Sequence, residues 1–251
     1  MSTLGSIGSK DYEQQTKIQN VAPEIPETAN TQTEEERLNI FRDAAVKFLS
    51  SQNEVDRIKG LKMLIAGIAK GLDVHEFAPF VVQLMLSPDL ITRQLSYIYL
   101  DHYSDQCYET ILLSINTLKK ALADNNPIFR CLAIKMISSV PNPEIIPEIQ
   151  SAIDQCIGDT NPYVKKSVAY AIIKAVELDP NLIEPFLPYI ERLMLETDFI
   201  ALSGAFAAYW SICPENIEFI HPNFRHIVNN IEKFDEYGQI YIMRSLAIYT
   251  R

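Results

Sequence analysis

The sequence predicts an all-α protein in which helical hairpins stack into a solenoid. A segment of about a dozen residues recurs along the chain, and its copies begin at Asn53, Asp89, Asn126, Asn161 and Asp198. The steps between these positions are 36, 37, 35 and 37 residues, a period typical of stacked helical hairpins. No run of alternating apolar and polar residues competes with the helical spacing.

The first helix of each unit has a recognisable start. An Asp or Asn precedes its apolar residues, where a side-chain oxygen accepts a hydrogen bond from an unpaired N–H of the first turn. Pro127 and Pro162 follow two of these residues, at the first helical position, where a missing N–H costs nothing. We expect helix caps at Asp89, Asn126, Asn161 and Asp198.

The second helix of each unit has a narrower apolar stripe. Ile111, Ile115, Leu118 and Leu122 are spaced by 4, 3 and 4 residues, which places them on one helix face. Short polar connectors between the helices force neighbouring helices to run antiparallel. The predicted fold is a right-handed α-solenoid of HEAT/armadillo-like hairpin repeats with a period of about 36 residues.

The two ends of the chain differ from the repeats. Residues 1–33 are rich in Ser, Thr, Gln, Glu and Pro, and we expect a disordered tail because such a segment buries too little apolar surface to offset its ordering entropy. Residues 34–251 form the predicted solenoid. Its last segment, 236–250, has the pattern of a first helix without a second, so we expect an array truncated in mid-unit.

Composition narrows the function classes. The 251 residues carry a net charge of −10, which argues against non-specific nucleic-acid binding. No apolar run predicts a transmembrane span or a secretory signal. The four cysteines lie at least 24 residues apart and are interpreted as buried, reduced residues of a cytoplasmic protein. The histidines have no metal-ligand spacing, and we expect no metal, no cofactor and no catalytic residues.

A cation stands four residues after the cap in four of the five copies. These residues are Arg57, Arg93, Arg130 and Lys165, and Leu202 breaks the series. One interpretation is a basic face for acidic lipid headgroups. The other, which the repeated position favours, is an internal ladder in which each cation pairs with a carboxylate or carbonyl of a neighbouring unit.

Five segments resemble the amino-terminal trunk of adaptin large subunits, the helical solenoids of vesicle-coat adaptor complexes. NPYVKK from Asn161 and YGQIYIM from Tyr237 are adaptin-like in general. CPEN from Cys213, IHPNFR from Ile220 and the terminal YTR point to the beta subunits of adaptor complex 3 within that family. The other matching runs start at Leu61 and Arg93, and the resemblance covers roughly residues 35–251.

The resemblance implies a non-enzymatic subunit of a cytoplasmic coat. Such subunits join a second large, a medium and a small subunit in a heterotetramer. Arf-family GTPases dock the complex as a peripheral component on the cytosolic face of Golgi or endosomal membranes and coated vesicles. Cargo is then routed toward a lysosome- or vacuole-like compartment.

The helix expected over 108–120 matches the region of related beta subunits that faces Arf. The resemblance implies Leu112 and Ile115 as its apolar contacts, whereas Ile115 also fits the core stripe of Ile111 and Leu118. An alternative for the whole protein is a generic HEAT/armadillo scaffold, of the phosphatase-scaffold or transport-receptor type. A single Trp argues against the nuclear-import form, which usually displays ordered Trp and Asn rows.

Overall fold

The computed structural model describes residues 34–249, and the expected disordered tail, 1–33, lies outside the described residues. Throughout 34–249 the regular elements are α-helices and short 3-10 helices, with no strand, so the all-α prediction is confirmed. No helix in this range is long and apolar enough to cross a membrane. The chain divides into two compact units, one ending at Tyr99 and one beginning at Leu100.

Unit 1 opens with a helical hairpin. Its helices are α2 (Glu34–Leu49) and α3 (Glu54–Ala69), which pack on each other through buried residues such as Phe41, Ala45 and Leu64. A short 3-10 helix, η1 (His75–Phe77), leads into α4 (Ala78–Leu84), and α5 (Leu90–His102) crosses the boundary between the units. The Tyr99 hydroxyl donates a hydrogen bond to the carbonyl of Val74 and so ties α5 to the η1 segment.

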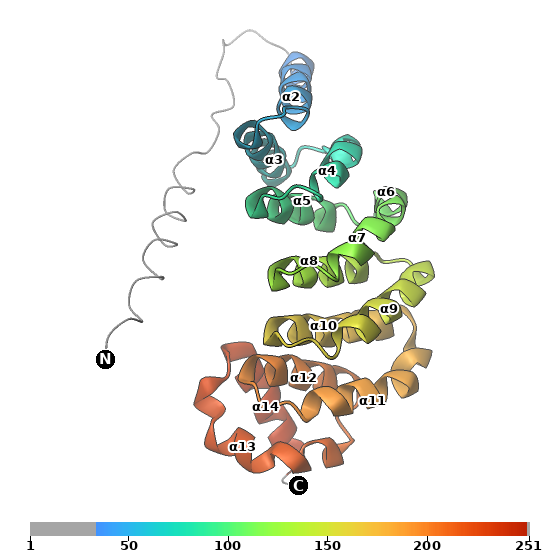
Figure 1. Ribbon diagram of the computed structural model, residues 1–251, viewed down its shortest axis with the longest axis vertical. Coiled ribbons are helices and arrows are strands. Elements are labelled where there is room, and N and C mark those ends of the chain that lie inside the picture. The colour runs from blue at the N-terminus through green and yellow to red at the C-terminus, as the bar shows by residue number, and fades with distance from the viewer. Residues whose placement is uncertain (1–33, 250–251) are drawn as a thin grey trace, which may run out of the picture. The chain divides into compact units, whose positions relative to one another are not determined.

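Unit 2 contains successive repeats in which each first helix packs on the next. The first helices are α8 (Pro127–Ser139), α10 (Pro162–Leu178), α12 (Phe199–Ile212) and α14 (Glu236–Tyr249). The second helices include α7 (Ile115–Ala121), α9 (Ile146–Cys156) and α11 (Ile183–Met194). Figure 1 shows α8, α10 and α12 as layers of one stack, and α10 contacts both α8 and α12.

Short 3-10 helices occupy the turns of unit 2. η2 (Pro143–Ile145) and η3 (Pro180–Leu182) precede α9 and α11, and Asn142 and Asp179 cap them. η4 (Ile217–Phe219), η5 (His221–Asn223), α13 (Phe224–Asn229) and η6 (Ile231–Lys233) connect α12 to α14. The first helices α8, α10, α12 and α14 begin at Pro127, Pro162, Phe199 and Glu236, in steps of 35, 37 and 37 residues that agree with the predicted period.

Burial follows each helix's position in the stack. α12 buries an unbroken run from Ala201 to Tyr209, because α10, α11 and α14 all pack against it. The side chains on this run are mostly small, which allows close approach of the neighbouring helices. α9 instead buries one stripe, Ile149, Ala152, Ile153 and Cys156, as its apolar spacing predicts.

The prediction of one continuous helix over 108–120 is wrong. The segment is divided into α6 (Tyr108–Leu113) and α7 (Ile115–Ala121), which meet at Ser114. Ser114 is buried, and both its N–H and its hydroxyl donate to the carbonyl of Ile111, at 2.9 and 2.7 Å. Ser96 and Ser245 make a similar hydroxyl-to-carbonyl bond within unbroken helices, so this bond accompanies the break without explaining it.

Candidate functional site

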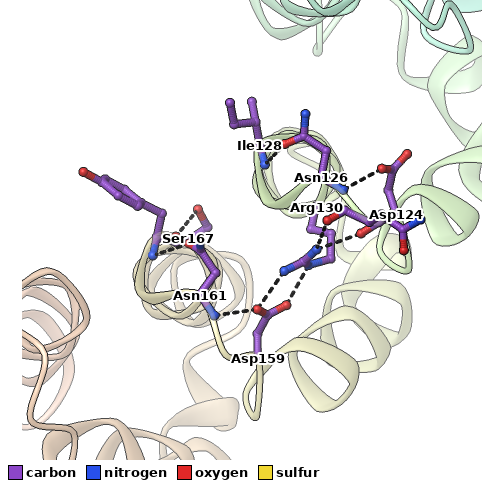
Figure 2. Close-up of polar contacts among 9 residues, drawn as sticks. Asp124, Asn126, Ile128, Arg130, Asp159, Asn161 and Ser167 are labelled. Carbon is purple, nitrogen blue, oxygen red and sulfur yellow. Dashed lines mark hydrogen bonds and ion pairs between the residues drawn. The ribbon is translucent and has the colours of Figure 1, made fainter. Parts of the chain in front are cut away.

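The most extensive polar contacts of the repeat stack surround Arg130 on α8 (Figure 2). Its guanidinium donates to both carboxylate oxygens of Asp159, at 2.7 and 2.8 Å, and Asp159 lies in the connector before α10. The same side chain donates to the carbonyls of Asp124 and Asn125, at 2.7 and 3.2 Å, in the connector before α8. Arg130 therefore joins two successive connectors of the array.

The pair is largely withdrawn from water. The side chains of Arg130 and Asp159 are 14% and 11% exposed. Burial alone would raise the pKa of Asp159, but hydrogen bonds from Arg130 and from the N–H of Asn161 outweigh it and hold the pKa below its usual value. The pKa of Arg130 is raised by its hydrogen bonds to Asp159. Both groups are thus kept charged across a wide pH range.

Lys165 occupies the equivalent position one repeat later. Its ammonium lies 2.7 Å from Glu196, in the connector before α12, and its side chain is 17% exposed. Leu202 stands at the next position of the series and is fully buried. The contacts of Arg130 and Lys165 are those of an internal ladder, and they leave little of either cation available to a lipid headgroup.

The first two members of the cation series lie in unit 1. Arg57 contacts the carbonyl of Gln52 at 3.5 Å, within its own connector rather than in the next one. Arg93, near the start of α5, is half-buried. The carboxylate pairing of unit 2 is therefore not repeated by Arg57.

The four expected cap residues each accept hydrogen bonds from the first turn of their helix. Asn126 and Asn161 accept from the N–H groups of Ile128 and Tyr163, each at 3.0 Å. Asp198 accepts from Ile200 at 2.8 Å. Asp89 accepts from both the N–H and the hydroxyl of Thr92, each at 2.7 Å.

Asp235 caps α14 in the same way but was not among the expected caps. Its carboxylate accepts from the N–H of Gly238 at 2.9 Å. The available signal was the period itself, since Asp235 stands 37 residues after Asp198.

The segment expected to contact a GTPase has its most exposed apolar side chain at an unexpected position. Leu113, the last residue of α6, is 87% exposed, whereas Leu112 is half-buried. Ile115 is also half-buried and lies on α7, beyond the break at Ser114. Leu113 lies two positions after the buried Ile111, which places it on the opposite side of the helix.

Metal-ligating and thiol side chains are spread along the described residues. No group of three or more His, Cys, Asp or Glu side chains within 34–249 is placed to hold a metal ion. Burial raises the pKa of the Cys156 thiol and of the Cys213 thiol to about 11. Such thiols are protonated at neutral pH and are poor nucleophiles.

Comparisons with known proteins place this fold in a family. The model of the adaptin N-terminal region matches residues 37–251. The chain is 35% identical over 224 residues to the AP-3 complex subunit beta of Dictyostelium discoideum, covering 89% of this chain and 19% of that protein. It is 33% identical over 205 residues to the human AP-3 complex subunit beta-1, covering 82% of this chain and 19% of that protein.

A structural comparison gives the same assignment. A homology model of the full-length AP-3 complex in an intermediate open conformation matches with a TM-score of 0.63 and 25% identity, over 96% of this chain and 41% of that chain. The chain spans about a fifth of the length of the two beta subunits named above. A match of the family model to most of the chain, together with these relatives, shows that the chain belongs to the adaptin family.

Proposed function

We propose that this chain is a scaffold subunit of a vesicle-coat adaptor complex of the AP-3 type, which acts in intracellular protein transport. The observation that carries the proposal is its 33–35% identity to AP-3 beta subunits over more than four-fifths of the chain. The repeat stack supports it, because a solenoid offers long surfaces for other subunits rather than a pocket for a substrate.

The proposed role is non-enzymatic. Burial raises the pKa values of the Cys156 and Cys213 thiols, so neither thiol is an activated nucleophile at neutral pH. The chain instead contributes shape and surface to an assembly with a second large, a medium and a small subunit.

We further propose peripheral attachment to membranes of the Golgi and endosomes through an Arf-family GTPase. The segment from Tyr108 to Ala121 is the proposed contact region, with Leu112, Leu113 and Ile115 as its apolar side chains. Direct binding of headgroups by the ladder cations is not part of this proposal, because Arg130 and Lys165 are paired with carboxylates.

A pull-down from cytosol with the chain as bait tests the proposal. Recovery of a second large adaptin with a medium and a small subunit is the expected result. Recovery of phosphatase subunits instead would favour the alternative of a generic HEAT/armadillo scaffold. A matched bait carrying Leu113→Asp separates the two kinds of contact, since it should retain the adaptor subunits but lose the GTPase.

A further inference from the structure

Asp235 connects three first helices of unit 2. It caps α14 through the N–H of Gly238, at 2.9 Å, and it accepts a hydrogen bond from the hydroxyl of Ser203 on α12. Its second carboxylate oxygen lies 2.5 Å from the ammonium of Lys166 on α10. The side chains of Lys166 and Asp235 are 22% and 38% exposed, so the pair is partly shielded from water.

The Lys166–Asp235 contact bridges helices two repeats apart. The two residues are 69 positions apart in sequence, and α12 packs between α10 and α14. The bridge requires that α10 and α12 approach each other closely. Gly204 on α12 allows this approach, because a Cβ at this position would lie 2.9 Å from the Cα of Lys166. A Cβ on Gly238 would likewise collide with the side chains of Ser203 and Asp235.

Few residues of α14 are fully buried. Of its residues only Gly238, Ile242 and Ser245 are buried, and just one of these is a large apolar side chain. α12, by contrast, buries nine consecutive residues, from Ala201 to Tyr209. Contacts of Tyr249 with His221 and Phe224, and of Arg244 with Trp210, hold the later turns of α14. The polar contacts of Asp235 hold its first turn.

We propose that Lys166, Ser203 and Asp235 form a latch that holds α14 on α12. When the latch is broken, α14 opens as a separate unit while α10 and α12 stay folded. Such local opening is expected where buried apolar contacts are few, because segments of a protein unfold with different free energies. The glycines at 204 and 238 make the latch possible, and the ion pair keeps it closed.

Native-state hydrogen exchange on the whole chain tests the latch. Lys166→Met keeps the apolar stem and removes the charge, and Asp235→Asn keeps an acceptor for Ser203 and Gly238. Each should speed exchange of the α14 amides by roughly tenfold, the effect of one lost charge-assisted hydrogen bond, with α12 amides unchanged. The double variant should be no faster than the faster single variant, because both remove the same contact.

Lys174→Met is the matched control. Lys174 is on the same helix and carries the same charge, but it pairs with Glu177 within α10, at 2.8 Å, so its removal should leave α14 exchange unchanged. The proposal is overturned if hydrogen exchange speeds up equally at the α12 and α14 amides, because α14 then does not open separately. It is also overturned if Lys166→Met leaves α14 exchange unaltered. Should Asp235→Asn fail to fold, Lys166→Met alone decides.

Discussion

Arg130 shows how one side chain joins two successive repeats. It is held by a bidentate carboxylate in the next connector and by two backbone carbonyls in the preceding one. Bidentate pairing of this kind depends on the planar guanidinium fork, which lysine lacks. Lys165, at the equivalent place, makes a single contact with Glu196.

Replacing Arg130 by Met should lower the free energy of unfolding by about 2–4 kcal/mol, because it leaves the largely buried Asp159 charged and without its partner. Urea unfolding followed by far-ultraviolet circular dichroism measures this. Lys120→Met is the control: Lys120 is an exposed cation at the end of α7, and its removal should change stability by less than about 0.5 kcal/mol. Equal effects of the two substitutions would refute a structural role for the ladder.

The Arg130–Asp159 pair predicts that the free energy of unfolding depends on pH. The pKa of Asp159 is lower in the folded protein than its ordinary value, so its ionised form stabilises the fold above the unfolded pKa of about 4, and this stability is lost as the pH falls below that value. The unfolding free energy should therefore fall between about pH 5 and about pH 3. Arg130→Met should flatten this slope. An identical slope in both proteins would show that Asp159 is not the group that titrates.

At the scale of the helix, the caps define where each repeat begins. Asn161 accepts from the N–H of Tyr163, and Pro162 occupies the first helical position, so that two first-turn donor positions need no further partner. The sequence was sufficient to predict these starts because capping is a local interaction between residues two or three positions apart.

Asn161→Ala should destabilise unit 2 by roughly 0.5–2 kcal/mol, while Asn161→Asp, which keeps an acceptor oxygen, should cost much less. Chemical denaturation of both variants gives the comparison. If Ala and Asp are equally neutral, the hydrogen bond to Tyr163 does not contribute to the stability of α10.

Leu113→Asp should leave the thermal midpoint within error, because Leu113 is at the surface, but should weaken recruitment to membranes by an Arf-family GTPase. Leu112→Asp is a less clean test, since Leu112 is half-buried and a charge there carries a desolvation cost. A sedimentation assay with GTP-loaded Arf on liposomes measures both. Full recruitment of the Leu113 variant would exclude α6 as the contact.

For the whole molecule, most of the predicted fold follows from the spacing of the sequence repeats. Self-similarity at steps of 35 to 37 residues was enough to give an all-α stack and the starts of its first helices. The helix break at Ser114 was missed because Ile111, Ile115 and Leu118 keep the apolar spacing of one continuous helix across it. The contact of Lys166 with Asp235 was missed because it depends on how closely α12 allows its two neighbours to approach, and such long-range geometry has no local pattern.

The most direct test of the central claim is co-expression of this chain with the second large, medium and small adaptor subunits of the same organism. Size-exclusion chromatography with light scattering then gives the composition and the mass of each species. The account predicts that the chain co-elutes in a stable complex with one or more of these subunits, at a mass equal to the sum of its parts. Elution of the chain alone, while the other subunits are folded and assembled with one another, would contradict it.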